Sequence, residues 1–474
     1  MVNNSSEEKY VYEGVIANHD SEPFEGQVVI NGDSGIIEEI TSKGVYKPSK
    51  KFDDSCFIFP GMGDVHIHAR EDETGDHSHK ETYSTAASAA KNGGTVHISA
   101  MPNTPSPVTD EERFKWHRDR VKSVSDDISI LNYVGIGNGT RPIGKLKEHF
   151  YKAYFGKSVG DLTFYDENEL ENTIKHYFGQ KVSFHVEYQP FIDASINGKN
   201  HSERRPEGAV NFGLKLLLPL IEKYKLDSKL CHWSTGGMSF EMIEEHRERS
   251  KREGFPYTTI EVSPLHLLFD NSMTERDPSL WMKIQMNPAI QGPDHRKALI
   301  KGLKDGFIDY LATDHAPHKE EEKYKAFNSL RCDYPNLSNV EIANEVKKHR
   351  PDLFQQKCCE DGTPGAPWLD VYAPVTVKLM NDYGFKPQDV ARFSSFNPGK
   401  FVNEYLSRQY EEFDFGKGFG KVEEGYVGSL SVINTNSPFK MTRDRVKSKA
   451  GWSPLEGMNF EGGLETLILR GKEL

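Results

Sequence analysis

The two ends of the chain share a pattern of short apolar runs. Near the start these runs are "KYVYEGVIAN", "GQVVINGDSGIIEEI" and "SCFIFPGMGD", and near the end they are "GSLSVINTN" and "GLETLILRGKEL". Gly, Asn and Pro break the runs, which is typical of short β-strands joined by turns. The pattern predicts a small β-sandwich domain that is built from both chain termini.

Between the two ends, helical and strand-like stretches alternate. The Ala-rich helical pattern "ETYSTAASAAKNGG" precedes the apolar strand pattern "TVHISAMP", and the alternation continues far along the chain. Such alternation favours a parallel α/β barrel or a doubly wound sheet. We expect residues 1–58 and 401–474 to form the small β domain and residues 59–400 to form the central α/β domain. A charged, partly helical stretch at about residues 320–360 has the character of an insertion into the central domain.

The overall charge and the cysteine pattern exclude several classes of protein. The chain has 474 residues and a formal net charge of -12, so we expect neither nucleic acid nor a membrane as a partner. Its five scattered cysteines are a poor disulfide framework. No stretch approaches the roughly 20 apolar residues of a membrane span, and the polar start gives no export signal. We therefore expect a cytoplasmic protein with reduced thiols.

The strongest local signal for chemistry is the segment "GMGDVHIHAR", which contains His66 and His68. Side chains at positions i and i+2 of a strand point to the same face, so both imidazoles could bind one ion. An isolated His-x-His pair also occurs by chance. Here Pro60 and the glycines indicate that the strand ends abruptly in a loop, which strengthens the prediction of a metal site.

Three further candidates recur at the ends of apolar strand patterns. They are His185 in "VSFHVEY", His232 in "KLCHWST" and Asp314 in "YLATDHAPH". Any one of them alone is more often a packed core residue than a ligand. In a TIM barrel, however, catalytic groups come from the C-terminal ends of several strands. Histidine and carboxylate together suit zinc or a similar divalent ion, so the set predicts a metal centre.

Lys152 lies in the short aromatic segment "FYKAYFGKSVGDL" and is a less obvious candidate. By itself it would be read as a surface lysine. An amine with a depressed pKa can also react with CO₂ to give an anionic carboxylated lysine, which nearby metal charge would stabilise. Such a group could bridge two ions.

Over nearly its whole length the chain resembles the dihydroorotase branch of the amidohydrolase superfamily. "DVHIHAR" is similar to that branch's Asp-x-His-x-His-x-Arg motif, and "HKETYSTAASAAKNGGTVHISAMPNT" to a family stretch that ends in Met-Pro-Asn-Thr. "EVSPLHLLFD", "MNPAIQGPDHRKALIKGLKDGFIDYLATDHAPH" and "SSFNPGKF" follow in the expected order, and "WSPLEGMNFEGGLETLILRGKEL" resembles the family's closing β segment. The resemblance implies a (β/α)8 TIM barrel with its site at the C-terminal face, beside the small β domain.

The resemblance also implies a role for each candidate residue. The metal ligands would be His66, His68 and Asp314 for one divalent ion, zinc by preference, and His185 and His232 for a second. Lys152, carboxylated by CO₂, would bridge the two ions, and a hydroxide between them would be the nucleophile. Asp314 would act as general base and then as general acid. The substrate-binding residues would be Arg70, Asn103, Asn287 and His318.

The activity that this implies is the reversible interconversion of (S)-dihydroorotate and N-carbamoyl-L-aspartate in pyrimidine biosynthesis. Arg70 favours this substrate because a guanidinium group can bind both oxygens of a carboxylate. A dihydropyrimidinase (hydantoinase) or an allantoinase is an alternative, whose substrate lacks that carboxylate. A non-catalytic scaffold for a partner enzyme is another, but it predicts lost ligands, and the set here is complete. We also expect a homodimer and an association with aspartate transcarbamoylase.

The chain departs from the family pattern at three places. The stretch "EDETGDHSHKE" after Arg70 is longer and more acidic than the usual turn, and Gln291 stands where an arginine is common. The stretch at 320–360 is longer than is typical of the family. These departures bear on the fit of the substrate more than on the hydrolytic chemistry.

Overall fold

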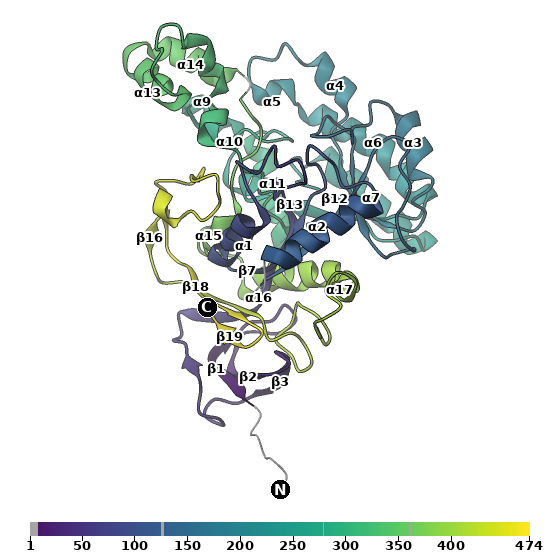
Figure 1. Cartoon of the computed structure of the whole chain (residues 1–474), viewed down its shortest axis with the longest axis vertical. Helices are drawn as coiled ribbons and strands as arrows, with labels where there is room; N and C mark the ends of the chain where they lie inside the picture. The colour runs from purple at the N-terminus through teal and green to yellow at the C-terminus, as the bar shows by residue number, and fades with distance from the viewer. Residues whose placement is uncertain (1–7, 125–127, 278, 361) are drawn as a thin grey trace.

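The computed structural model describes residues 8–124, 128–277, 279–360 and 362–474 (Figure 1). It is a mixed α/β structure with a β-rich unit at one end. In Figure 1 the purple strands from the start of the chain and the yellow strands from its end lie together in this unit. Among the described residues, no helix combines the length and the apolar character that crossing a membrane requires.

The β-rich unit is one sheet whose strand order is β19-β18-β15-β5-β1-β2-β3, with β4 paired to β1. Its strands are β1 (Lys9–Ile16), β2 (Phe24–Asn31), β3 (Ile37–Thr41), β4 (Lys50–Lys51), β5 (Cys56–Pro60), β15 (Leu430–Asn434), β18 (Gly463–Leu469) and β19 (Lys472–Glu473). Strand β5 pairs with β1 on one side and with β15 on the other. The two ends of the chain therefore meet in one sheet, as the sequence predicted, and Ile58, Val432 and Ile468 share its apolar core.

The central part contains two parallel sheets. The larger has the order β14-β13-β12-β11-β10-β9 and the smaller β6-β7-β8. Their strands are β6 (Met62–Ile67), β7 (Thr95–Ala100), β8 (Ser129–Asn132), β9 (Val134–Ile136), β10 (Phe150–Tyr154), β11 (Lys181–His185), β12 (Asp227–Leu230), β13 (Thr259–Val262) and β14 (Tyr310–Leu311). Only Tyr133 separates β8 from β9, and a parallel bridge joins Ile67 to His315 beyond the end of β14. The two sheets thus adjoin at both of their edges.

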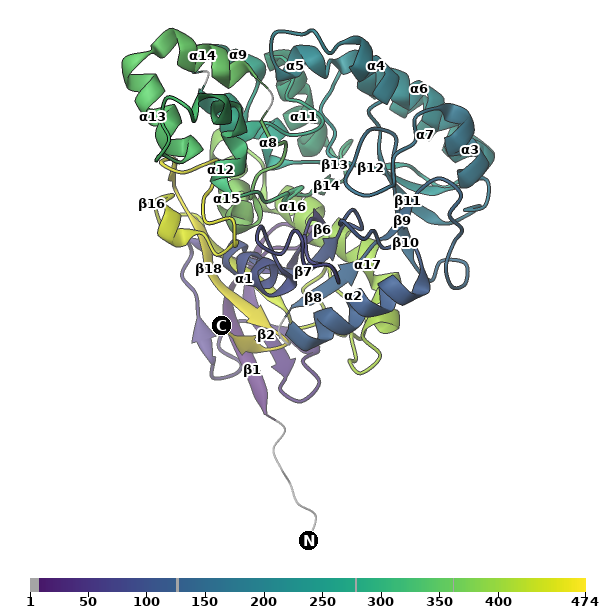
Figure 2. The same cartoon turned by 45° about the horizontal axis from the view of Figure 1, so that its top comes forward.

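Helices alternate with these strands and cover them on the outside (Figure 2). The long ones are α1 (Tyr83–Gly93), α2 (Glu111–Val124), α3 (Glu167–Ile174), α6 (Glu207–Lys223), α7 (Met238–Glu253), α11 (Pro293–Asp305), α15 (Tyr372–Tyr383) and α17 (Asn397–Gln409). The short ones are α4 (Gln189–Ala194), α5 (His201–Arg204), α8 (Pro264–Leu268), α9 (Asn271–Arg276), α10 (Ser279–Ile284) and α16 (Pro387–Ala391). The remaining pieces are β16 (Phe439–Lys440), β17 (Asn459–Phe460) and the single turns η2 (Leu369–Val371), η3 (Arg392–Phe396) and η4 (Arg443–Arg445).

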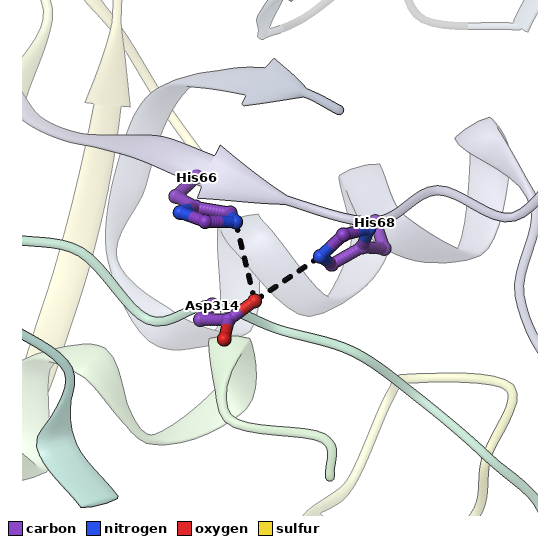
Figure 3. A group of neighbouring side chains, drawn as sticks. All are labelled: His66, His68 and Asp314. Atoms are coloured by element: carbon purple, nitrogen blue, oxygen red, sulfur yellow. Dashed lines mark hydrogen bonds and ion pairs between the residues drawn. The ribbon is translucent and has the colours of Figure 1, made fainter. Parts of the chain in front are cut away.

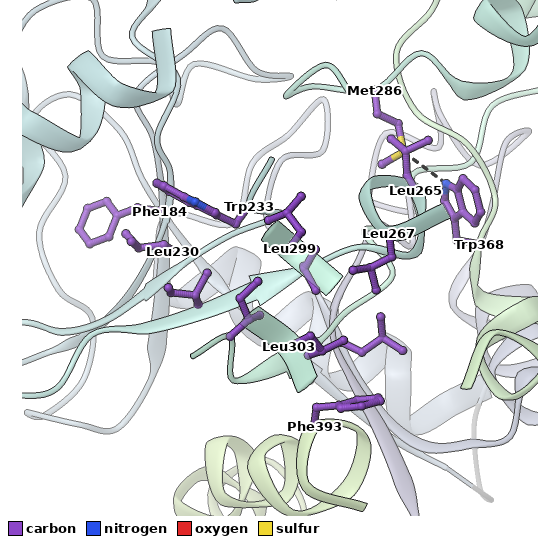
Figure 4. Packing of buried hydrophobic residues seen from close by; sticks show 14 of the residues in the cluster. Phe184, Leu230, Trp233, Leu265, Leu267, Met286, Leu299, Leu303, Trp368 and Phe393 are labelled. Carbon is purple, nitrogen blue, oxygen red and sulfur yellow. Dashed lines mark hydrogen bonds between the residues drawn. The ribbon is translucent and has the colours of Figure 1, made fainter. Parts of the chain in front are cut away.

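The apolar side chains between strands and helices form the main core (Figure 4). Trp233, Leu265 and Leu303 are buried in it. Trp368 is also fully buried, and its indole Nε1 donates to the sulfur of Met286 at 3.2 Å. This core holds the strands rigidly, which lets the loops at their C-terminal ends carry polar side chains in fixed positions.

The stretch expected to be an insertion forms a helical unit at one corner of the molecule, as Figure 1 shows for α13 and α14. Its elements are α12 (Glu320–Lys323), η1 (Lys325–Leu330), α13 (Asn339–His349) and α14 (Pro351–Cys359). Phe327, Ile342 and Phe354 bury against Met282 of α10 in a small apolar cluster of their own. The unit is therefore packed independently of the main core.

Candidate functional site

The six residues predicted as metal ligands lie at or near the C-terminal ends of five parallel strands. His66 lies in β6 and His68 just beyond it, Lys152 lies in β10 and His185 ends β11. His232 and Asp314 follow β12 and β14 within three residues. Parallel strands end at the same edge of their sheet, which brings the six together. A cavity of about 330 Å³ is lined by all of them except Lys152, which is buried beneath it.

His66, His68 and Asp314 converge on one point (Figure 3). Asp314 Oδ1 lies 3.2 Å from His66 Nε2 and 3.1 Å from His68 Nε2. The other ring nitrogens have partners, because His66 Nδ1 meets the carboxylate of Glu261 and His68 Nδ1 lies 2.8 Å from Asn103 Oδ1. Each Nδ1 therefore donates its proton, and each Nε2 directs a lone pair at a carboxylate oxygen.

Two imidazole nitrogens and a carboxylate oxygen that converge in this way can together hold a cation. Burial lowers the pKa of His66 to about 4 and that of His68 well below its usual value, so both rings are neutral near pH 7. Neutral imidazoles and a carboxylate are the ligands that divalent ions such as zinc prefer. The donors present thus fit a metal ion at this point.

A second pair of donors lies beside the first. His185 Nδ1 is 2.9 Å from His232 Nε2, and burial lowers the pKa of both rings. The Nδ1 atom of His232 is buried without a hydrogen-bond partner in the described part of the chain. His232 stands 5.3 Å from His66 between ring centroids, so the two groups are neighbours.

Lys152 is fully buried, and its amine has no hydrogen-bond partner among the described residues. Its polar neighbour is the thiol of Cys231, and the ring of Tyr154 lies 5.1 Å away. A buried amine without hydrogen bonds is costly. Its charge also acts on His66, His185 and Asp314. The sequence prediction that Lys152 belongs to the centre is therefore consistent with its position.

The four residues predicted to bind substrate line the same cavity. They are Arg70, Asn103, Asn287 and His318. Arg70 Nη2 lies 3.3 Å from His318 Nε2, while Arg70 Nε and Asn287 Oδ1 are buried without a hydrogen-bond partner within the described ranges. Burial lowers the pKa of Arg70 to about 10, which leaves the guanidinium charged at neutral pH. The charged Arg70 guanidinium, whose Nε has no partner among the described residues, thus faces the space next to His66, His68 and Asp314.

Three site residues hold left-handed backbone conformations. The φ angles are 62° at Arg70, 36° at His232 and 47° at Asp314. Residues other than glycine adopt this region at a cost, and such outliers concentrate at functional sites. The surrounding contacts must therefore hold these three residues in place.

Comparison with known proteins places the chain among cyclic amide hydrolases. No family model matches it. It is 31% identical over 479 residues to the dihydroorotase of Bacillus licheniformis, covering 97% of this chain and 96% of that protein. It is 33% identical to the dihydroorotase of Bacillus pumilus over 88% of this chain and 86% of that protein. The chain belongs to the dihydroorotase family.

Solved structures with the same fold are more distant from this dihydroorotase-family chain. The L-hydantoinase of Arthrobacter aurescens superimposes with a TM-score of 0.74 at 17% identity, over 98% of this chain and 95% of that one. The dihydropyrimidinase of Brevibacillus agri gives 0.75 at 15% identity, with the same coverage. At these identities the likeness establishes the shared fold and no more.

Two residues that the sequence did not predict, Glu261 and Lys229, support the dihydroorotase-family site from the adjacent strands β13 and β12. Glu261 in β13 accepts from His66 Nδ1 and, at 3.0 Å, from the backbone N–H of His232. Its other oxygen accepts from Lys229 of β12, and both side chains are 1% exposed. Burial lowers the pKa of Lys229, but the Glu261 carboxylate outweighs it and raises that pKa well above its usual value. Charged residues inside the apolar patterns "SKLCHWS" and "TIEV" were the available signal.

We predict that Lys229→Met destabilises the protein by about 3–5 kcal/mol, because it leaves the Glu261 carboxylate buried without its cation. The double variant Lys229→Met/Glu261→Gln should recover much of this loss, since no uncompensated charge remains. Urea denaturation followed by fluorescence measures both. Lys251→Met, which removes an exposed pairing with Glu248, is the matched control. Equal losses in the single and double variants would contradict the claim that the uncompensated Glu261 charge causes the loss.

Proposed function

We propose that the chain is a dihydroorotase, which catalyses the reversible hydrolysis of (S)-dihydroorotate to N-carbamoyl-L-aspartate in de novo pyrimidine biosynthesis. The observation that carries the proposal is one cavity in which Arg70, Asn103 and His318 lie beside the cluster around Asp314. A cyclic amide with an anionic substituent needs both parts. The family relationship supports the same conclusion.

The centre would hold two divalent ions, with zinc favoured by the imidazole and carboxylate donors. His66, His68 and Asp314 would bind one, and His185 and His232 the other. Lys152, carboxylated by CO₂, would contribute to both, which would resolve its lack of a hydrogen-bond partner. When bound, such ions lower the pKa of water and polarise a carbonyl group.

Asp314 would carry the proton in the reaction. Burial raises the pKa of its carboxyl group, and the nearby His66 and Lys152 lower it. A carboxylate that is removed from bulk water can accept a proton from the attacking water and return it to the leaving ring nitrogen. The left-handed backbone at Asp314 directs this side chain toward both histidines of the first pair.

Arg70 would bind the carboxylate of the substrate, with His318, Asn103 and Asn287 around it. The guanidinium group can donate two parallel hydrogen bonds to one carboxylate. Arg70 Nε is buried and without a partner in the described segments, so it is available for this purpose. This arrangement distinguishes dihydroorotate from the neutral rings of a hydantoinase or an allantoinase.

We also infer that the two adjoining sheets close into a single barrel. The strands β6 to β14 would form one (β/α)8 barrel, in which β8 and β9 count as a single strand. The β-rich sheet would be a small sandwich, with boundaries at 1–58, 59–400 and 401–474. Residues 1–7 of the first segment lie outside the described residues, and the last boundary falls within α17.

Cytoplasmic location, a homodimer and an association with aspartate transcarbamoylase belong to the same proposal. A small-molecule substrate is the partner that the cavity supports. The net charge of -12 is consistent with a protein that binds neither nucleic acid nor anionic lipid.

For Arg70→Met we expect the KM for dihydroorotate to rise about 10- to 100-fold, because a charge-assisted pair with the substrate carboxylate is lost. The KM for dihydrouracil, which lacks the carboxylate, should not rise in this way. Steady-state kinetics with both substrates measure this. Arg252→Met, on an exposed side chain, is the control. An unchanged KM for dihydroorotate would contradict the carboxylate assignment.

For Lys152→Ala we expect the metal content to fall from two ions per chain to one or fewer, because the shared ligand is lost. Elemental analysis of zinc-supplemented, dialysed protein measures the content directly. Lys175→Ala, at an exposed lysine, should keep the same two ions per chain as the unmodified protein. Two ions retained in the Lys152 variant would rule out the bridging role.

A further inference from the structure

The two ends of the helical unit at residues 320–360 lie next to the cavity. At one end, α12 follows directly after His318, which lines the cavity. At the other end, Thr363, Pro364 and Gly365 line the cavity themselves, and so do Met286 and Asn287 of a third segment. We call residues 363–365 together with 285–287 the cavity wall. The position of this cavity wall therefore determines the shape of the space that a substrate would occupy.

Lys323, the last residue of α12, joins the parts of this wall. Its ammonium Nζ donates to the backbone carbonyl oxygens of Thr363 at 2.6 Å, Gly365 at 2.6 Å and Gln285 at 3.2 Å. An ammonium group has three N–H donors, and all three are used. The side chain is fully buried. Burial lowers the pKa of Lys323 to about 7. Through these hydrogen bonds one amine connects α12, the 363–365 segment and the segment that carries Asn287.

Among the described residues, no carboxylate hydrogen-bonds to the Lys323 Nζ. The charged groups that act on Lys323 are Lys325 and Glu322. The Glu322 carboxylate is directed elsewhere, to Lys80 at 3.1 Å and to the backbone N–H of Lys319 at 2.9 Å. Within the described ranges, the three carbonyl oxygens are therefore the direct partners of the buried amine. Because a buried amine without hydrogen bonds is costly, the wall must keep these oxygens where they are.

The same segment is fastened by a second layer of hydrogen bonds. The N–H of Gly365 donates to Gln285 O at 2.8 Å, and the N–H of Gly362 donates to Gln285 Oε1 at 2.6 Å. The hydroxyl of Thr363 donates to Glu322 O at 2.8 Å. Gly365 has φ = +116°, and a Cβ there would lie 2.5 Å from Ala316 O. All of these contacts are made together in this structure.

We propose that Lys323 is a positioning residue, which holds the cavity wall at Thr363, Gly365 and Asn287 in the shape that accepts the ring of the substrate. The proposal rests on the dihydroorotase function proposed above and deepens it. Lys323 acts on the binding of substrate through the wall, and it does not touch the metal ligands or the proton carrier. Its loss should therefore affect KM rather than kcat.

A purely structural role for Lys323 makes a different forecast. The helical unit has its own apolar core around Phe327, Ile342 and Phe354. If Lys323 only attached this unit, its removal would lower stability and leave the KM of the folded enzyme unchanged. The division between KM and kcat thus separates the two roles.

The experiment compares the unmodified protein with Lys323→Met and with Lys348→Met. Methionine keeps the side chain as far as Cε and removes the amine. Lys348 lies in α13 of the same helical unit and is exposed, so it is the matched control. Three quantities are measured for each protein: hydrogen exchange of the amides in residues 362–366, steady-state kinetics with dihydroorotate, and zinc content.

For Lys323→Met we expect the wall amides to exchange at least about tenfold faster, because the carbonyl groups lose their common donor. We expect KM to rise about tenfold or more, while kcat changes less than about threefold. Zinc content should be unchanged. Lys348→Met should match the unmodified protein in all three quantities.

Unaltered exchange in the wall, or a loss in kcat and zinc at constant KM, would overturn the proposal. If Lys323→Met does not fold, Lys323→Gln keeps an uncharged donor on a shorter side chain, and it should raise KM and exchange by a smaller factor; no change there would overturn the proposal as well. The exchange arm does not need a substrate. An unmodified protein that fails to turn over dihydroorotate would thus refute the proposed function and still leave the wall tested.

Discussion

Buried electron-pair donors that converge at the wall of a cavity are the constraint on which the rest of this structure depends. Asp314 Oδ1 lies 3.2 Å from His66 Nε2 and 3.1 Å from His68 Nε2. The arrangement is held because each ring donates a hydrogen bond from Nδ1, His66 to Glu261 and His68 to Asn103. The parallel strands supply a rigid edge, and the Glu261 and Asn103 side chains orient the two rings.

The same logic explains the ion pair beneath the site. Burial raises the pKa of Glu261, but Lys229 outweighs it and holds that pKa well below its usual value, so the group is ionised. It accepts from His66 and from the strained backbone of His232, and a lone carboxylate there would be unstable. Lys229 neutralises it from the adjacent strand, within reach of the rings of Tyr133 and Phe401. A polar network of this kind is stabilising only when every member has its partner.

Much of the site could be predicted from the sequence, because its residues carry a local signal. His66 and His68 stand two apart at a strand end, and Asp314 follows a short apolar strand. The meeting of both chain ends in one sheet could be predicted as well, since both ends have the same strand pattern. Lys229 could not, because its role comes from a neighbouring strand that sequence spacing does not identify. Lys323 was hidden for a similar reason: its three partners are backbone oxygens, which leave no trace in residue types.

The helical unit at 320–360 shows how a local departure from the family pattern can reach the cavity. The unit packs on its own core, yet both of its ends touch the residues that surround the substrate space. One buried ammonium group connects those ends. The helical unit can therefore influence which ring fits beside His66, His68 and Asp314 without covering these residues.

The most direct test of the central claim is a comparison of three ring substrates on purified, zinc-supplemented protein: dihydroorotate, dihydrouracil and allantoin. Ring opening of each is followed under the same conditions. A dihydroorotase with Arg70 as its carboxylate partner should open dihydroorotate and leave the two neutral rings essentially unchanged. Opening of a neutral ring in preference to dihydroorotate, or no turnover of any ring with zinc bound, would contradict the account.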